Sequence, residues 1–112
     1  MEKILKELDS YLGYRDYSDD EGLTQEVIDN AKILLKHIFP LIPESVEFNE
    51  DYIYPTSDTI IFDIQNNKGI LISIEIGKNS VHFFISGLEK YVFGAYYMNE
   101  LEKINSVFNY FH

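Results

Sequence analysis

The chain has 112 residues, of which 46% are hydrophobic and 25% are charged, and this is the size and composition of a single globular domain. Its 19 acidic residues against 9 basic ones give a net charge of −10, which disfavours direct binding to nucleic acid or an anionic membrane and favours a basic protein surface. The absence of cysteine excludes disulfide bonds, thiolate zinc sites and cysteine nucleophiles.

The first residues and the hydropathy of the chain bear on its location. Residues 1–8 are amphipathic and acidic, whereas a signal peptide has a basic segment followed by an apolar run. No apolar run reaches the ~18 residues needed to cross a bilayer. We therefore expect a soluble, cytoplasmic protein with no membrane segment. We find no internal repeat and no linker, so residues 1–112 are predicted to form one domain.

The N-terminal third predicts two helices separated by a loop. A helix is expected over residues 2–12, with Gly13 in the left-handed conformation after its end. Residues 13–22, GYRDYSDDEG, are polar and acidic and predict a surface loop. A second helix is expected over residues 25–39, with the Thr24 side chain as its N-terminal cap and the FPLIP segment as its stop. The apolar positions that define these two helices are Ile4, Leu5, Leu8 and Leu12, then Val27, Ile28, Ala31, Leu34, Leu35 and Ile38.

From Ser45 the apolar period changes from that of a helix to that of a strand. Residues 46–48 and 52–54 alternate between apolar and polar, with a turn or bulge at 49–51 between them. Better-defined strands follow, and the Asn and Gly residues between them are typical of hairpin turns. The expected strands are 59–65, 70–76 and 81–86.

The last 22 residues predict a further strand and a helix. The segment YVFGAYY, residues 91–97, has the composition of a strand that is broken or bent at Gly94. Asn99 and Glu102 have the spacing of a capping box, and a helix is expected over residues 100–110. Its apolar face comprises Leu101, Ile104, Phe108 and Phe111.

The strand registers follow from matching apolar faces, because a shift of one residue would turn every side chain to the wrong face. The first hairpin is predicted to pair Ile60 with Ile74, Phe62 with Ile72 and Ile64 with Ile70. The second is predicted to pair Ile72 with Ile85, Ile74 with Phe83 and Ile76 with Val81. All these side chains then face the helices and form the core. The opposite face carries Thr59, Ile61, Asp63, Leu71, Ser73, Glu75, His82, Phe84 and Ser86, and it is either open or covered by the C-terminal segment.

Two groups of polar residues have a spacing that could support catalysis or metal binding. Glu75 falls opposite His82, so the two could be a catalytic base with its orienting group, a pair of metal ligands or an ordinary ion pair. A metal site would need a third ligand, and Asp63 is out of register with this pair. The acidic loop has EF-hand-like spacing, but Glu21 stands at the required glycine and Val27 at the required glutamate. We predict no cofactor, no metal and no catalytic residue.

The segment PTSDTIIFDI, followed by ILISIEI, resembles a group of small bacterial proteins with the pattern P-T-x-D-G-G-x-I-x-L-E-W and then L-x-I-E-I. Thr59 replaces the glycine pair with one residue fewer, and Ile64 replaces the tryptophan. The resemblance implies a hairpin meander and a bacterial origin, and it implies no activity. The matching residues are Pro55, Thr56, Asp58, Ile60, Phe62, Asp63, Ile72, Ile74, Glu75 and Ile76.

The sequence therefore predicts an α+β domain: two N-terminal helices, an antiparallel meander of four or five strands and a C-terminal helix, with all helices on one face. The leading functional hypothesis is a small acidic protein that occludes a basic site on a partner protein, such as an immunity protein, an antitoxin or an anti-defence inhibitor. The alternatives are a self-associating module whose open sheet face is buried in a homodimer, and an enzyme that uses Glu75 and His82. The predicted partner-binding residues are Tyr14, Tyr17, Asp19, Asp20, Glu21, Glu50, Asp51, Tyr52, Tyr54, Ile61, His82 and Phe84.

Overall fold

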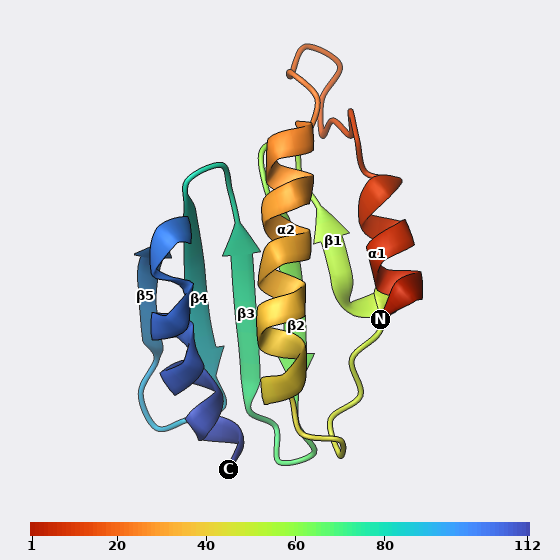
Figure 1. Cartoon of the computed structure of the whole chain (residues 1–112). Helices are drawn as coiled ribbons and strands as arrows, with labels where there is room; N and C mark the ends of the chain where they lie inside the picture. The colour runs from red at the N-terminus through yellow and green to blue at the C-terminus, as the bar shows by residue number, and fades with distance from the viewer.

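A computed structural model describes all 112 residues and shows a sheet with helices on one of its faces (Figure 1). The strands follow one another as an antiparallel meander in the order β1-β2-β3-β4-β5. This confirms the predicted α+β class with five strands. The elements are α1 (Glu2–Asp9), α2 (Gln25–Ile38), η1 (Phe39–Leu41), η2 (Glu50–Tyr52), β1 (Ile53–Pro55), β2 (Ile60–Gln65), β3 (Leu71–Ile76), β4 (Ser80–Ser86), β5 (Val92–Tyr97) and η3 (Met98–Phe111), where η denotes a 3₁₀ helix.

The core lies between the sheet and the three longer helices. Every apolar residue of the α2 stripe is buried, as predicted, and α2 packs on β2 and β3. The 3₁₀ helix η3 packs on β5 and against α2, and α1 packs beside α2 and η2. Each fully buried Ile, Leu or Phe contributes about 1.5–3 kcal/mol, so burial in this core is the main favourable contribution to the free energy of folding. None of the helices is long and apolar enough to cross a membrane.

The first helix is shorter than predicted. It ends at Asp9, so Leu12 lies outside it and is 57% exposed, while Tyr11 takes its place in the core. Gly13 does adopt the predicted left-handed conformation, with φ of +80°. Thr24 precedes α2 as expected, but its side chain makes no capping hydrogen bond and its hydroxyl is buried without a partner.

Residues 46–52 do not form a strand, which corrects the prediction. The side chain of Asn49 accepts a hydrogen bond from the backbone N–H of Asp51 at 2.8 Å, and this bond begins η2. Such local side-chain bonds compete with a sheet ladder. Only the three residues of β1 remain as the first strand, and they pair with β2.

The register of the second hairpin is as predicted, and that of the first is shifted by two residues. The first hairpin pairs Ile60 with Ile76, Phe62 with Ile74 and Ile64 with Ile72. A shift of two keeps every side chain on its predicted face, so the core is unchanged. On the open face, however, Asp63 lies opposite Ser73 instead of Leu71, and Glu75 lies opposite Ile61.

The C-terminal strand is not broken at Gly94, and its pairing with β4 continues through this residue. A Cβ atom at this position would lie 2.8 Å from Cζ of Phe83, so the missing side chain makes room for the ring. The helix that follows begins at Met98, and its cap is the carboxylate of Glu100, which accepts from the backbone N–H of Tyr97 at 3.2 Å. The predicted capping pair of Asn99 and Glu102 is therefore wrong.

Candidate binding surfaces

The face of the sheet opposite the helices is uncovered. The C-terminal segment packs on the helical face, so it does not cover Ile61, Leu71 or Phe84. Ile61 and Leu71 are half-buried among their neighbours on the sheet, and Phe84 is 40% exposed. The question that the sequence left open is thus settled in favour of an open face.

The polar residues at the centre of this face, Glu75 and His82, make hydrogen bonds to other residues and not to each other. Glu75 faces His82 across the ladder as predicted, but no ion pair joins them. The Thr59 hydroxyl donates to Glu75 at 3.0 Å, and Nε2 of His82 lies 3.3 Å from the Ser80 hydroxyl. The residues Ile61, Ser73, Glu75, His82, Phe83 and Phe84 line a hollow of about 230 Å³.

No group of three or more His, Asp or Glu side chains lies close enough together to hold a metal ion. Two carboxylates of the acidic loop, those of Asp16 and Asp20, stabilise the loop itself. Asp16 accepts from the backbone N–H of Ser57 at 3.1 Å, and Asp20 accepts from the Ser57 hydroxyl at 2.7 Å. That hydroxyl also accepts from the backbone N–H of Asp16 at 2.7 Å, and Ser57 is the one buried polar residue of the chain.

The anchored loop exposes a tyrosine and two acids. Its base is closed by the N–H of Gly13 donating to the carbonyl of Leu23 and by the N–H of Leu23 donating to Tyr14, both at 2.9 Å. Tyr17 is 72% exposed, and Asp19 and Glu21 are exposed in the same loop. Asp20, predicted to bind a partner, is half-buried, and its carboxylate accepts hydrogen bonds from the Ser57 hydroxyl and from the backbone N–H of Tyr17.

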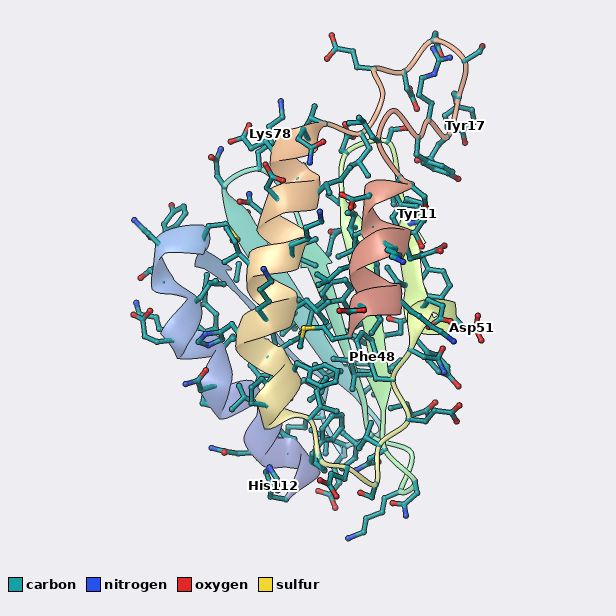
Figure 2. All side chains as sticks on the ribbon, turned by 45° about the vertical axis from the view of Figure 1, so that its right-hand side comes forward. Tyr11, Tyr17, Phe48, Asp51, Lys78 and His112 are labelled. Carbon is teal, nitrogen blue, oxygen red and sulfur yellow. The ribbon has the colours of Figure 1, made fainter.

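The fold brings the second predicted cluster, residues 50–54, to the same side of the molecule. Glu50, Asp51 and Tyr52 form η2, and Tyr54 lies on the open face in β1, opposite Ile61. We call this side the acidic edge, and it consists of the loop 14–22 together with residues 50–54, which form η2 and the start of β1. Figure 2 shows Tyr17 and Asp51 on the α1 side of the molecule. Asp51 and Tyr54 are exposed, whereas Glu50 and Tyr52 are half-buried.

A core residue closes the free edge of β1. The Tyr11 hydroxyl lies within hydrogen-bond distance of two acceptors, the carboxylate of Glu7 at 3.2 Å and the carbonyl oxygen of Ile53 at 3.3 Å. Burial, followed by the charge of Glu7 and the hydrogen bond to it, raises the pKa of Tyr11 to about 12. The hydroxyl therefore keeps its proton and remains a donor beside β1 at all ordinary pH values.

The opposite side of the open face carries aromatic residues that the sequence interpretation did not single out, apart from Phe84. We call Phe84, Tyr91, Phe93 and Tyr97 the aromatic edge. Phe93 lies opposite Phe84 in the ladder, and the Phe84 and Tyr91 rings are 5.2 Å apart. Phe93 is 76% exposed and Tyr97 66% exposed. Their alternation within YVFGAYY was the available signal, since extending the β4 register onto this segment puts both on the open face.

The net charge is divided unequally between these two sides. Residues 1–65 contain 15 Asp and Glu against 5 Lys and Arg, and residues 66–112 contain 4 against 4. Residues 1–65, which include α1, α2, the acidic loop, η2, β1 and β2 with their connecting segments, thus carry the whole charge of −10. The part with β3, β4, β5 and η3 is neutral.

Comparisons with protein-family models, with curated proteins and with solved structures found no match.

Proposed function

We propose that this protein is a small acidic binding protein that covers a basic surface of a partner protein, in the manner of an immunity protein, an antitoxin or an anti-defence inhibitor. The observation that supports it best is the concentration of the whole net charge in the part that carries the acidic edge. A field of one sign steers a basic partner toward that side and raises the rate of association.

The acidic edge also offers contact area. Tyr14, Tyr17 and Tyr54 are exposed there, and tyrosine gives a large contact at a low entropic cost. The carboxylates of Asp19, Glu21 and Asp51 accept no hydrogen bond from the rest of the chain, so they remain able to pair with arginine. Because Tyr54 lies opposite Ile61, the contact would extend from the edge onto the open face, toward His82 and Phe84.

The test begins with capture of the partner from the native host at low ionic strength, and association rates are then measured on the purified pair. In the test variant Asp19→Asn, Glu21→Gln and Asp51→Asn are combined. The matched control combines Glu44→Gln, Glu89→Gln and Glu102→Gln, which removes the same charge from exposed positions outside the acidic edge. We expect association to slow by about tenfold in the test variant and by much less in the control.

Salt and aromatic truncation complete the design. Binding should weaken as salt is raised, because exposed charges are screened beyond about 10 Å at 0.1 M. Tyr17→Ala should weaken the complex, whereas Tyr110→Ala, which removes an exposed tyrosine from η3, should not. A partner that binds both charge variants equally and ignores salt would refute the proposal.

A further inference from the structure

Strand β5 forms the outer edge of the neutral side of the sheet, and nothing covers that edge. It is the last strand in the sheet order, and η3 lies over the β4 and β5 side, not beyond it (Figure 1). Its six residues, VFGAYY, include no charge, no proline and no bulge. Monomeric proteins usually protect such edges with one of these features, because a free edge pairs readily with another strand.

The free backbone groups of β5 can be assigned from the ladder. The N–H of Met98 donates to the carbonyl of Asn79 at 2.9 Å, and backbone groups turn alternately toward and away from the neighbouring strand. Tyr96 and Gly94 therefore turn toward β4, and Ala95 and Phe93 turn outward. The outward N–H of Tyr97 is occupied by Glu100. The backbone N–H and C=O groups of Phe93 and Ala95 therefore remain free, and they offer two donors and two acceptors to a second strand.

We propose that β5 pairs with β5 of a second copy of this chain, antiparallel about a two-fold axis at Gly94, so that the two sheets become continuous. This register sets Phe93 opposite Ala95 of the other copy, and both of these residues turn their backbone groups outward. A large side chain then lies beside a small one on the open face. At the axis the two Gly94 residues meet without side chains, so the backbones can approach closely.

The distribution of charge favours a second copy as the occupant. The part of the chain from residue 66 onward is neutral, so two copies joined at β5 keep their acidic edges at the far ends of the combined sheet. The turn before β5 contains Glu89 and Lys90, and the start of η3 contains Glu100, Glu102 and Lys103. These two ends meet in the antiparallel pair, where three acids and two bases leave a net charge of only −1. A neutral edge has no charge with which to attract a basic peptide, which the acidic edge would draw instead.

The aromatic edge adds apolar contact to the backbone pairing. Tyr97 of one copy comes opposite Tyr91 of the other, next to Phe93 and Phe84. Cross-strand aromatic pairs of this kind stabilise a sheet, and in the single copy Phe93 and Tyr97 are largely exposed. The partner-binding surface at the acidic edge stays free in the dimer, so this inference does not depend on the proposed function.

Sedimentation over a range of concentrations tests the dimer, with three variants. Ala95→Pro removes an outward N–H that β4 does not use, a place where an edge strand tolerates proline. We expect it to raise the dimer dissociation constant by about tenfold or more, because one hydrogen bond is lost from each copy. Phe84→Lys should leave the dimer largely intact, since Phe84 lies one strand inside the edge, and Tyr54→Lys on β1 should leave it unchanged.

Amide exchange of the unmodified chain gives an answer that does not depend on how a variant folds. The amides of Phe93 and Ala95 should gain protection as the concentration rises, while those of Gly94 and Tyr96 stay protected throughout. A chain that remains monomeric at high micromolar concentration would overturn the inference. So would a dimer in which Phe93 and Ala95 exchange freely, or one that Phe84→Lys abolishes and Ala95→Pro does not, because the sheets would then stack face to face.

Discussion

Strands β1 and β5 form the two edges of one sheet, and they differ in length, sequence and surroundings. β1 has three residues, ends at Pro55 and is flanked by the acidic loop and η2, while the Tyr11 hydroxyl lies against the carbonyl of Ile53. β5 has six residues with no charge and no proline, and only the N–H of Tyr97 is occupied from outside the ladder.

The difference shows that a small meander can protect its two edges by different means. At β1 the chain itself supplies the protection, since short length, proline, charge and a capping side chain all oppose strand addition. At β5 the same protection requires another strand. One edge is thus suited to contacts between side chains and the other to pairing of backbones, and each can be altered without touching the other.

The largest effect is expected from Gly94→Val, which alters the attachment of β5. The new side chain would point toward the helices, where even its Cβ atom would lie 2.8 Å from the ring of Phe83. That ring is stacked on Tyr96 with centroids 5.6 Å apart, so both must move. We expect a loss of about 1–3 kcal/mol in the free energy of unfolding, measured with urea at low protein concentration.

The matched control is Ala95→Val, which adds the same side chain to the next residue of β5, on the open face. Since Ala95 is exposed, this change should alter stability by less than about 0.5 kcal/mol. Equal losses of stability in both variants would mean that the Phe83 ring is not the reason why position 94 requires glycine.

A smaller effect is expected from Ser57→Ala, which acts at the acidic edge. The change removes the hydroxyl that accepts from the N–H of Asp16 and donates to Asp20, and leaves these groups without that partner. A loss of about 1–2 kcal/mol should follow, together with faster proteolysis within residues 14–22. Ser18→Ala, in the same loop, removes a hydroxyl that makes no hydrogen bond in the structure and should behave like the unmodified chain. An intact loop after Ser57→Ala would show that other contacts hold it.

The parts of the fold that could be predicted rest on local periodicity. The α2 stripe and the alternation in β2, β3 and β4 gave the right elements and the right faces. The first register could not be decided in this way, because a shift of two residues preserves the faces. The turn between β2 and β3 determines this register. The side chain of Asn66 accepts a hydrogen bond from the backbone N–H of Ile70 at 2.9 Å, and the backbone N–H of Asn66 donates to the carbonyl of Ile70 at 3.0 Å. Gln65 is thereby set opposite Leu71.

The candidate surfaces were predictable to different degrees. The acidic and tyrosine clusters were visible in the sequence, but their meeting at one edge depends on Ser57, which bonds to Asp16 from 41 residues away. No local pattern signals such a bond. The exposure of Phe93, by contrast, follows from alternation along β5 once its pairing with β4 is known.

The smallest effect is expected from Tyr11→Phe, which removes the hydroxyl that caps β1. At neutral pH the loss should be about 0.5–1.5 kcal/mol, the net value of a typical hydrogen bond. Its dependence on pH is more specific. The pKa of Tyr11 is raised from 10.0 to about 12 in the native state, mainly by burial and then by Glu7, so the unfolded chain releases this proton first. The stability that Tyr11 contributes is therefore complete below pH 10 and is lost as the pH rises through about 12.

Urea unfolding of both chains at several pH values measures this contribution. Other tyrosines and lysines also titrate in the alkaline range, so the informative quantity is the difference in stability between the unmodified chain and Tyr11→Phe. That difference should be constant up to pH 10 and then shrink toward pH 12. Tyr110→Phe, which alters an exposed hydroxyl that makes no hydrogen bond in the structure, should show no such change. A difference that stayed constant up to pH 12 would mean that the Tyr11 hydroxyl is not buried against β1. The β1 edge would then lack one of the features that distinguish it from the unprotected edge of β5.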